Sequence, residues 1–239
     1  MMRPTSLTGA QARAYDRWCT DVARVPGIEL MEHAAEAIAE AIEPWRPAPT
    51  AGDTAPTVDV ACGSGNNGGD GYAVARLLHE RGWIVSIIRL QPPRPGSDAA
   101  VNADRARAAG IPIVSPSTAA PVPRVIVDAI LGTGFRSAQP LDDGPGKMIQ
   151  HVRLAREGGA LVVAVDIPSG LDADTGHAAD ARCCVVADMT VTMVLPKAGF
   201  GFADGPSSVG RVVVAAILPA GHAGPDACAW DRILRSHDA

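Results

Sequence analysis

The run Leu161-Val162-Val163-Ala164-Val165 is apolar on both faces of any strand that it could form. A strand of this kind needs cover on both sides, which helices provide for the central strands of a parallel sheet. From Thr57 onward, further strand-sized apolar runs alternate with segments of helical periodicity. This alternation predicts an α/β fold with three layers and a doubly wound, mostly parallel sheet.

The predicted elements follow one another closely after residue 57. Strands are expected at Val58–Cys62, Trp83–Leu90, Ile111–Val114, Arg124–Ile130, Ala160–Ile167, Met189–Leu195 and Arg211–Ile217. Helices between them are expected at Gly68–Arg81, Asp98–Ala109 and Pro145–Arg156. Such an order is typical of a Rossmann-like fold.

Two helices are expected before this alternation begins. The first, Gln11–Arg24, follows Thr8 as its N-cap, and the second, Ile28–Ile42, ends at Pro44. Residues 46–56 are rich in Pro and Ala and predict a peripheral connector. Because no internal repeat or stronger boundary is present, we expect residues 1–239 to form one domain with an N-terminal helix pair.

Composition restricts the environment and the partners. The chain is 47% hydrophobic and 20% charged, which excludes a disordered tail. Its net charge of −5 offers no basic surface to nucleic acid, and its longest apolar runs are too short to span a bilayer. Five cysteines without CxxC spacing favour reduced thiols, and the N-terminus lacks the apolar core of a signal peptide. We expect a cytoplasmic protein that binds neither nucleic acid nor membrane.

The densest chemical signal is the segment 63–71, Gly-Ser-Gly-Asn-Asn-Gly-Gly-Asp-Gly, between a predicted strand and a predicted helix. Glycines let a backbone approach a ligand, and the following helix N-terminus favours a phosphate. The usual acidic residue about 20 positions further on is missing, which argues against ordinary NAD binding. The alternative interpretation is a tight glycine turn, although Asn66, Asn67 and Asp70 are more polar than a turn requires.

Acidic residues and glycines also follow two other predicted strands. Asp128 interrupts an apolar strand before Gly132-Thr133-Gly134, and it is either a buried functional acid or a simple cap or loop residue. Asp166 ends the most apolar strand of the chain. Ligands of open α/β sheets bind beyond the carboxyl ends of the strands, so these segments predict one shared crevice.

Together these stretches resemble the YjeF N-terminal domain family, the NAD(P)H-hydrate epimerases. The resemblance covers about residues 7–218 and rests most firmly on NNGGDG at 66–71 and DIPSGLDADTG at 166–176. It also includes Val127-Asp128-Ala129, the segment 187–192 and Lys197. The family interconverts the R and S epimers of hydrated NADH and NADPH, which implies an isomerase acting in nicotinamide nucleotide repair.

The resemblance also implies site residues. A potassium ion would be held by Asn67, Asp128 and Ser169, whose hard oxygen donors and single negative charge suit that cation. The implied substrate-binding residues are Asn66, Asn67, Gly68, Gly69, Asp70, Gly132, Thr133, Gly134, Phe135, Arg136, Ser137, Ala138 and Asp166. We assign the proton-transfer role to Asp166, because it ends a buried strand three residues before a proposed cation ligand.

The implied partners are hydrated NADH or NADPH as substrate and a separate ADP- or ATP-dependent dehydratase that acts on the S form. The chain leaves no room for that dehydratase as a second domain, and a homodimer is expected. One alternative is a non-catalytic nucleotide-binding or scaffolding module of the same fold. A less favoured one is an NAD(P)-dependent oxidoreductase, weakened by the missing ribose-binding acid.

Overall fold

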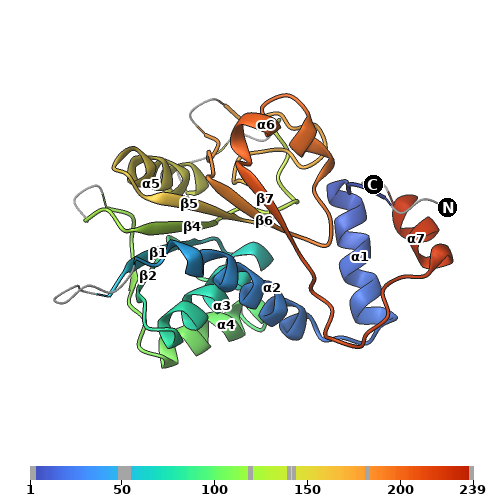
Figure 1. Ribbon diagram of the computed structural model, residues 1–239, viewed down its shortest axis with the longest axis horizontal. Coiled ribbons are helices and arrows are strands. Elements are labelled where there is room, and N and C mark those ends of the chain that lie inside the picture. Colours follow the sequence, from blue (N-terminus) through green and yellow to red (C-terminus); the bar gives the residue numbers. More distant parts are fainter. Residues whose placement is uncertain are drawn as a thin grey trace.

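The computed structural model describes residues 4–47, 55–117, 121–138, 141, 144–180 and 183–236. Its centre is a sheet of seven parallel strands in the order β3-β2-β1-β4-β5-β6-β7 (Figure 1). The strands are β1 Thr57–Cys62, β2 Ile84–Ile88, β3 Ile113–Val114, β4 Val125–Ala129, β5 Leu161–Val165, β6 Met189–Met193 and β7 Arg211–Ala215. The chain order reverses between β1 and β4, which creates a switch point at their carboxyl ends.

Helices cover both faces of the sheet, as the predicted three-layer fold requires. One face packs against α2 Gly27–Ile42, α3 Asn66–Glu80 and α4 Asp98–Ala108. The other face packs against α5 Pro145–Glu157 and the segment around Val185. Every side chain from Val162 to Val165 in β5 is fully buried, because that strand receives cover from both layers.

The seven predicted strands are all confirmed, but several end one or two residues earlier than the apolar pattern suggested. In β5 the strand stops at Val165 because Asp166 has a φ of 64°, which a strand cannot contain. In β6 it stops at Met193 because Val194 has a φ of 69°. The apolar sequence continues through Val194, so only the backbone reveals that break, whereas position 166 holds an aspartate, a residue type enriched at positive φ.

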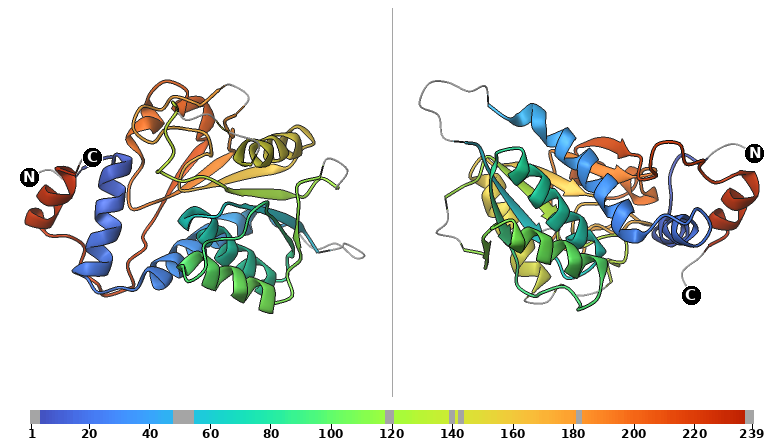
Figure 2. Two further views of the ribbon diagram at one scale, coloured as in Figure 1. Left: turned by 180° about the vertical axis from the view of Figure 1, so that it is seen from behind. Right: turned by 90° about the horizontal axis from the view of Figure 1, so that it is seen from below.

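Both N-terminal helices are present, and Cys19 of the first shares a small buried cluster with Leu30 of the second, although each helix packs mainly on other neighbours. Thr8 forms the predicted N-cap of α1 Gly9–Asp21, in a capping box with Gln11. Helix α2 lies on the sheet and α3, whereas α1 lies beyond the end of the sheet (Figures 1 and 2). Short helical segments at Glu43–Trp45, Ala198–Gly201 and Gly205–Ser208 complete the connections.

A C-terminal helix, α7 Ala227–Leu234, was not expected from the sequence. It packs on the outer side of α1, where the rings of Tyr15 and Trp230 lie 5.6 Å apart (Figure 2). Asp226 caps it, and Ile233 is buried with Ile217 against α1. The signal in the sequence was Asp226 as an N-cap, followed by apolar residues at helical spacing.

Two further findings bear on the environment of the chain. All five cysteines carry unpaired thiols. Among the described residues, no helix combines the length and apolar character that crossing a membrane requires. The connector expected at 46–56 lies mainly outside the described residues.

The glycines of segment 63–71 do two different jobs, because α3 begins at Asn66 rather than at Gly68 as predicted. Gly68 lies inside the helix, where a Cβ would come within 2.0 Å of the Gly63 carbonyl oxygen. A Cβ on Gly71 would stand 2.6 Å from the Ala129 Cβ. These glycines therefore let α3 approach the sheet closely, and only Gly65, with no atom near its Cβ position, faces open space.

Gly68→Ala is expected to destabilise the fold, since the added methyl group must displace rigid backbone. Overpacking of this kind costs about 1–3 kcal/mol, which lowers the melting temperature of a chain this size by roughly 2–12 °C. Gly65→Ala is the matched control: its Cβ would meet no atom, so the melting temperature should fall only by about 1–3 °C, because Ala is a poorer N-cap than Gly by somewhat less than about 1 kcal/mol. Thermal unfolding measures both, and equal shifts would contradict the close-approach argument.

Candidate functional site

A cavity of about 1260 Å³ lies at the carboxyl ends of the strands, where the chain order reverses. Its walls come from α1, the β1–α3 turn, the segment after β4, and the ends of β5 and β6. Among the predicted site residues, the ones that line it are Asn66, Asn67, Asp70, Gly132, Thr133, Gly134, Phe135 and Asp166. The expected convergence of the strand ends on one crevice is therefore confirmed.

Asp166 pairs with Lys197 on the cavity wall. The Lys197 Nζ donates to Asp166 Oδ1 at 2.5 Å, and Oδ1 also accepts from the Met193 backbone N–H at 3.0 Å and from Thr192 Oγ1 at 3.1 Å. Among the described residues, no hydrogen bond ends on Asp166 Oδ2. One carboxylate oxygen is thus fixed by the protein, and the other is available to a reactant.

Lys197 is the most deeply buried charged group of this wall, with 1% of its surface exposed. Besides Asp166, its Nζ donates to Thr192 Oγ1 at 2.9 Å and to the carbonyls of Met193 at 3.3 Å and Leu195 at 3.4 Å. A buried ammonium group is tolerated only when it is paired and fully hydrogen-bonded, as here. Lys197 was part of the sequence resemblance but was assigned no role.

Two strained turns hold this pair. The Ile167 N–H donates to the Val165 carbonyl, and the Leu195 N–H donates to the Met193 carbonyl, both at 2.8 Å. The central residues, Asp166 and Val194, have φ values of 64° and 69°, which defines the rare γ-turn of positive φ. Such strain persists only where the surroundings enforce it, and it concentrates at functional sites.

The three predicted cation ligands form one hydrogen-bonded cluster, of which only Asn67 lines the cavity. Asp128 and Ser169 are fully buried, with Ser169 Oγ donating to Asp128 Oδ1 at 2.5 Å and Ser169 N–H to Oδ2 at 2.8 Å. The Leu131 backbone joins them to Asn67: its N–H donates to Ser169 Oγ, and its carbonyl accepts from Asn67 Nδ2, both at 2.9 Å. Asp128 lies within β4, so it is neither a helix cap nor a loop acid.

Burial raises the pKa of Asp128 to about 6, against the opposing effect of the hydrogen bonds from Ser169 and Ile130. None of the described groups that act on this pKa carries a positive charge. A carboxylate, a hydroxyl, an amide and a backbone carbonyl in one buried cluster are a donor set that fits a weakly charged, oxygen-preferring cation.

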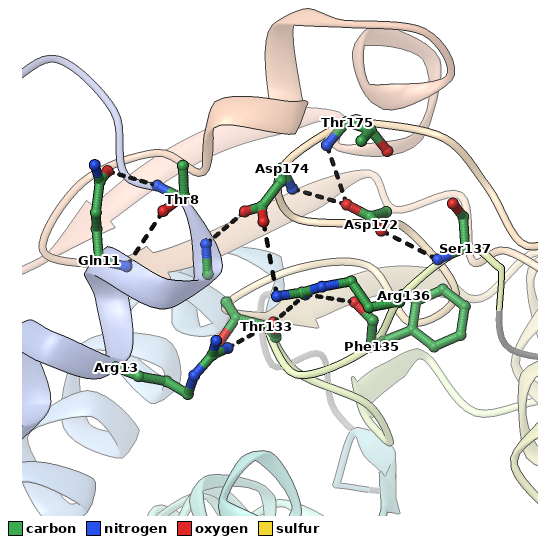
Figure 3. Close-up of polar contacts among 11 residues, drawn as sticks. Thr8, Gln11, Arg13, Thr133, Phe135, Arg136, Ser137, Asp172, Asp174 and Thr175 are labelled. Atoms are coloured by element: carbon green, nitrogen blue, oxygen red, sulfur yellow. Dashed lines mark hydrogen bonds and ion pairs between the residues drawn. The ribbon is translucent and has the colours of Figure 1, made fainter. Parts of the chain in front are cut away.

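Two aspartates, Asp172 and Asp174, form a clamp that holds the loop 132–138 in place, as Figure 3 shows. Asp172 accepts hydrogen bonds from the backbone N–H groups of Asp174, Thr175 and Ser137. Burial would raise the pKa of Asp172, but these hydrogen bonds outweigh it and hold the pKa below its usual range. Asp172 therefore stays ionised and fixes the turn at 172–175 against Ser137.

Asp174 extends the clamp to helix α1. It accepts from the Gly9 N–H at 2.6 Å and pairs with Arg136 at 3.7 Å, while Arg136 and Arg13 both donate to the Thr133 carbonyl (Figure 3). Five predicted substrate residues, Gly68, Gly69, Arg136, Ser137 and Ala138, do not line the cavity. Gly68 and Gly69 pack inside the fold, and Arg136 and Ser137 serve this clamp.

Asp16 is the cavity-lining acid to which sequence reasoning assigned no role. It projects from α1 near Asp166 and Lys197, and desolvation by the surrounding walls, reinforced by the Asp166 charge, raises its pKa to about 6. The pKa of Asp70 is also raised well above its usual value. Desolvation is the main cause, and the negative charges of Asp166 and Asp16 add to it. Asp98, at the start of α4, also reaches the cavity wall.

Residues 27–199 match the family described as YjeF-related protein N-terminus. The chain belongs to this family. The match spans the cavity from α2 to Gly199 and therefore includes the Asp166–Lys197 pair and the buried Asp128 cluster. Helix α1 and its Asp16 lie outside the matched range.

Curated relatives in the YjeF family extend the similarity over nearly the whole chain. An NAD(P)H-hydrate epimerase of Limosilactobacillus fermentum is 36% identical and aligns with 90% of this chain and 97% of its own length. A protein of the same name from Rhodopirellula baltica is 34% identical over 91% of this chain and 87% of its own length. A bifunctional NAD(P)H-hydrate repair enzyme of Moorella thermoacetica is 35% identical over 88% of this chain but only 40% of its own length.

The fold of this chain also occurs in a solved structure. The crystal structure of the yeast protein YNL200c superposes with a TM-score of 0.74 and covers 98% of this chain and 95% of its own. Its sequence identity is 19%, so this likeness concerns the fold alone.

Proposed function

We infer that this chain is an NAD(P)H-hydrate epimerase, an isomerase that interconverts the R and S forms of hydrated NADH and NADPH. The observation that carries the assignment is the alignment with epimerases over nearly their whole length. The geometry agrees with it, since the shared motifs end on one cavity that holds a carboxylate paired with a buried lysine.

The cavity suits a dinucleotide. Its volume of about 1260 Å³ exceeds that of ordinary small-ligand pockets, about 300–1000 Å³. The N-terminus of α3 opens into it at Asn66 and Asn67, and such termini bind phosphate through their free N–H groups. We place the substrate pyrophosphate there and the hydrated ring toward Asp166, with Asp70 and the stretch Gly132–Phe135 as further contacts.

Epimerisation requires that a bond at the hydroxyl-bearing carbon break and re-form on the opposite face. Either route, through an opened ring or through an iminium ion, moves a proton at the hydroxyl group. Asp166 is the group proposed to move that proton, through the Oδ2 atom that the protein leaves available. Lys197 holds Oδ1 and keeps the carboxylate in place.

Potassium is the proposed cofactor of the buried cluster formed by Asn67, Asp128 and Ser169. A cation held there would neutralise Asp128 and fix the Leu131 backbone, which borders the substrate loop. The support is the chemistry of the donors and the lack of a positive group acting on Asp128 among the described residues.

Potassium is expected to stabilise the protein more than sodium does. At a concentration ten times its dissociation constant, a bound ion adds about 1.4 kcal/mol to the free energy of unfolding. Thermal unfolding in KCl, NaCl and choline chloride at equal ionic strength measures the shift. Ser169→Ala should abolish it, whereas Ser207→Ala, at an exposed position of the short helix Gly205–Ser208, should keep it. Identical melting curves of the native chain in all three salts would remove the cation from the proposal.

We also propose that the protein works in the cytoplasm as a homodimer beside a separate dehydratase. Strand β7 lies at the edge of the sheet and leaves Val212 and Val214 partly exposed, an apolar strip that a second copy could cover. Sedimentation equilibrium tests the dimer. The bifunctional relative supports the link between epimerisation and a second repair activity.

The decisive assay uses hydrated NADPH as an epimer mixture with an excess of purified ATP-dependent dehydratase. The dehydratase consumes the S form, and the epimerase is expected to accelerate conversion of the remaining R form above its uncatalysed rate. No acceleration would favour a non-catalytic scaffolding module. Oxidation of NADPH by an added carbonyl compound would favour an oxidoreductase.

A further inference from the structure

One polar face of helix α1 is turned into the cavity. Arg13, Asp16, Arg17 and Thr20 all line it, and their spacing of three, four and seven residues places them on one side of the helix. The opposite side, with Ala14, Tyr15 and Cys19, is buried against α7 and Ile217. A polar helix face normally meets bulk water, whereas this one forms a wall of the substrate cavity.

Helix α1 is fixed to the same segment that carries Lys197. Just before the helix, Leu7 pairs with Lys197 as in a parallel sheet: the Leu7 N–H donates to the Pro196 carbonyl at 2.9 Å, and the Ala198 N–H to the Leu7 carbonyl at 2.8 Å. Gly9 is held by Asp174, and α7 braces the outer side. The position of Asp16 relative to the Asp166–Lys197 pair is therefore set by backbone contacts.

Charged groups from several elements face Asp16. Asp166 comes from the end of β5, Lys197 from the segment after β6, and Asp70 from α3. Arg13, Arg17, Tyr15 and Cys19 belong to its own helix. Asp98, at the start of α4, also lines the cavity, so four carboxylates share it, and Lys197 contacts only Asp166 among them. Like charges that lie close together favour the protonated form of one of the carboxyl groups, and the group that keeps the proton is one that has no contact with Lys197.

We propose that Asp16 is a second acid–base residue of the epimerisation and works opposite Asp166. This inference rests on the proposed function. Asp166 takes the proton of the hydroxyl group while a carbonyl forms and the bond from that carbon to the ring nitrogen breaks, and Asp16 gives its proton to the nitrogen. The carbonyl group then rotates so that its opposite face points toward the nitrogen. The nitrogen adds to the carbonyl carbon and returns its proton to Asp16, while Asp166 returns the first proton to the oxygen.

Asp16 fits this role better than Asp70 because the proton must reach a reactant. Asp16 is exposed to the cavity, whereas Asp70 is only partly exposed, within the first turns of α3. Asp166 cannot serve both atoms in one step, since its free oxygen already carries the hydroxyl proton. Two separate groups, one protonated and one ionised, are the usual arrangement for such a transfer.

Asp16→Asn in the full chain is expected to lower kcat for R-to-S conversion by about 10²–10⁴-fold, with KM changed less than about threefold. The kcat/KM of the native chain should fall as pH rises through about 6, where Asp16 loses its proton. That fall should be absent from the residual activity of the variant. Asp16→Glu should recover part of the rate.

Asp21→Asn is the matched control, because Asp21 is an exposed carboxylate at the end of the same helix and does not line the cavity. It should keep the native rate and melting temperature. If the native chain is active and Asp16→Asn is equally active, the role of Asp16 alone is overturned. The same holds if the fall of kcat/KM with rising pH disappears in Asp70→Asn instead of in Asp16→Asn. An inactive native chain would overturn the proposed function itself.

Discussion

Asp166→Asn is expected to reduce kcat for epimerisation by about 10²–10⁴-fold, the range that loss of an acid–base group produces. Asparagine tolerates the positive φ of position 166 and still accepts a hydrogen bond from Lys197, so the chain should remain folded. It cannot take a proton from the substrate hydroxyl. The loss should therefore appear in kcat and only weakly in KM.

The dehydratase-coupled assay, run well below the melting temperature of each variant, measures the effect of Asp166→Asn. Asp188→Asn is a suitable control, because Asp188 is also ion-paired, 3.5 Å from Arg156, but lies outside the cavity. Each substitution removes the carboxylate of an ion pair, yet only Asp166→Asn should lose activity. Native turnover in Asp166→Asn would refute the assignment of Asp166.

Much of the fold was predictable from hydrophobic periodicity. The run Leu161–Val165 is apolar on both faces, which indicated a covered parallel sheet, and Thr8 and Pro44 marked helix boundaries correctly. Helix α7 escaped because it packs on α1 rather than on the sheet. The Asp226 cap marked its start, but its packing on α1 depends on contacts such as that of Gln11 with Leu234, 223 residues away in the chain, which no local pattern encodes.

The candidate site was predictable only in part. Strand ends carrying Asp128 and Asp166 indicated a crevice, since parallel strands end at one edge. Asp16 belonged to the resemblance but was assigned no role for a physical reason: charged residues at helical spacing most often face water. Its placement depends on Leu7 pairing with Lys197, a contact across 190 residues of chain. The positive φ value at Val194 likewise leaves no mark in the sequence, because the apolar run continues through that position.

Lys197 links these features, because it joins three segments that are distant in the chain. Its backbone pairs with Leu7 before α1, and its ammonium group holds Asp166 at the end of β5 and the carbonyls that follow β6. Removal of this one charge should therefore affect stability and catalysis together. A substitution that keeps the length of the side chain separates the electrostatic effect from packing.

Lys197→Met is expected to destabilise the fold by about 3 kcal/mol, the lower end of the range for breaking a buried ion pair, because Asp166 retains 17% exposure. For a chain of this size that corresponds to a fall of about 6–12 °C in melting temperature. The Asp166 carboxylate also loses the ammonium group that holds its Oδ1 atom, so epimerase activity should drop strongly. Thermal unfolding and the coupled assay measure the two effects.

The double variant Lys197→Met with Asp166→Asn decides whether charge is the cause. A neutral asparagine no longer needs the lysine, so the double variant should be more stable than Lys197→Met alone by about 1 kcal/mol or more, a coupling typical of residues in direct contact. Its activity should stay as low as that of Asp166→Asn, because the proton-transfer group is gone. Strictly additive losses of stability would instead mean that Lys197 acts through packing of its aliphatic chain, and the pair would lose its proposed role in holding the carboxylate.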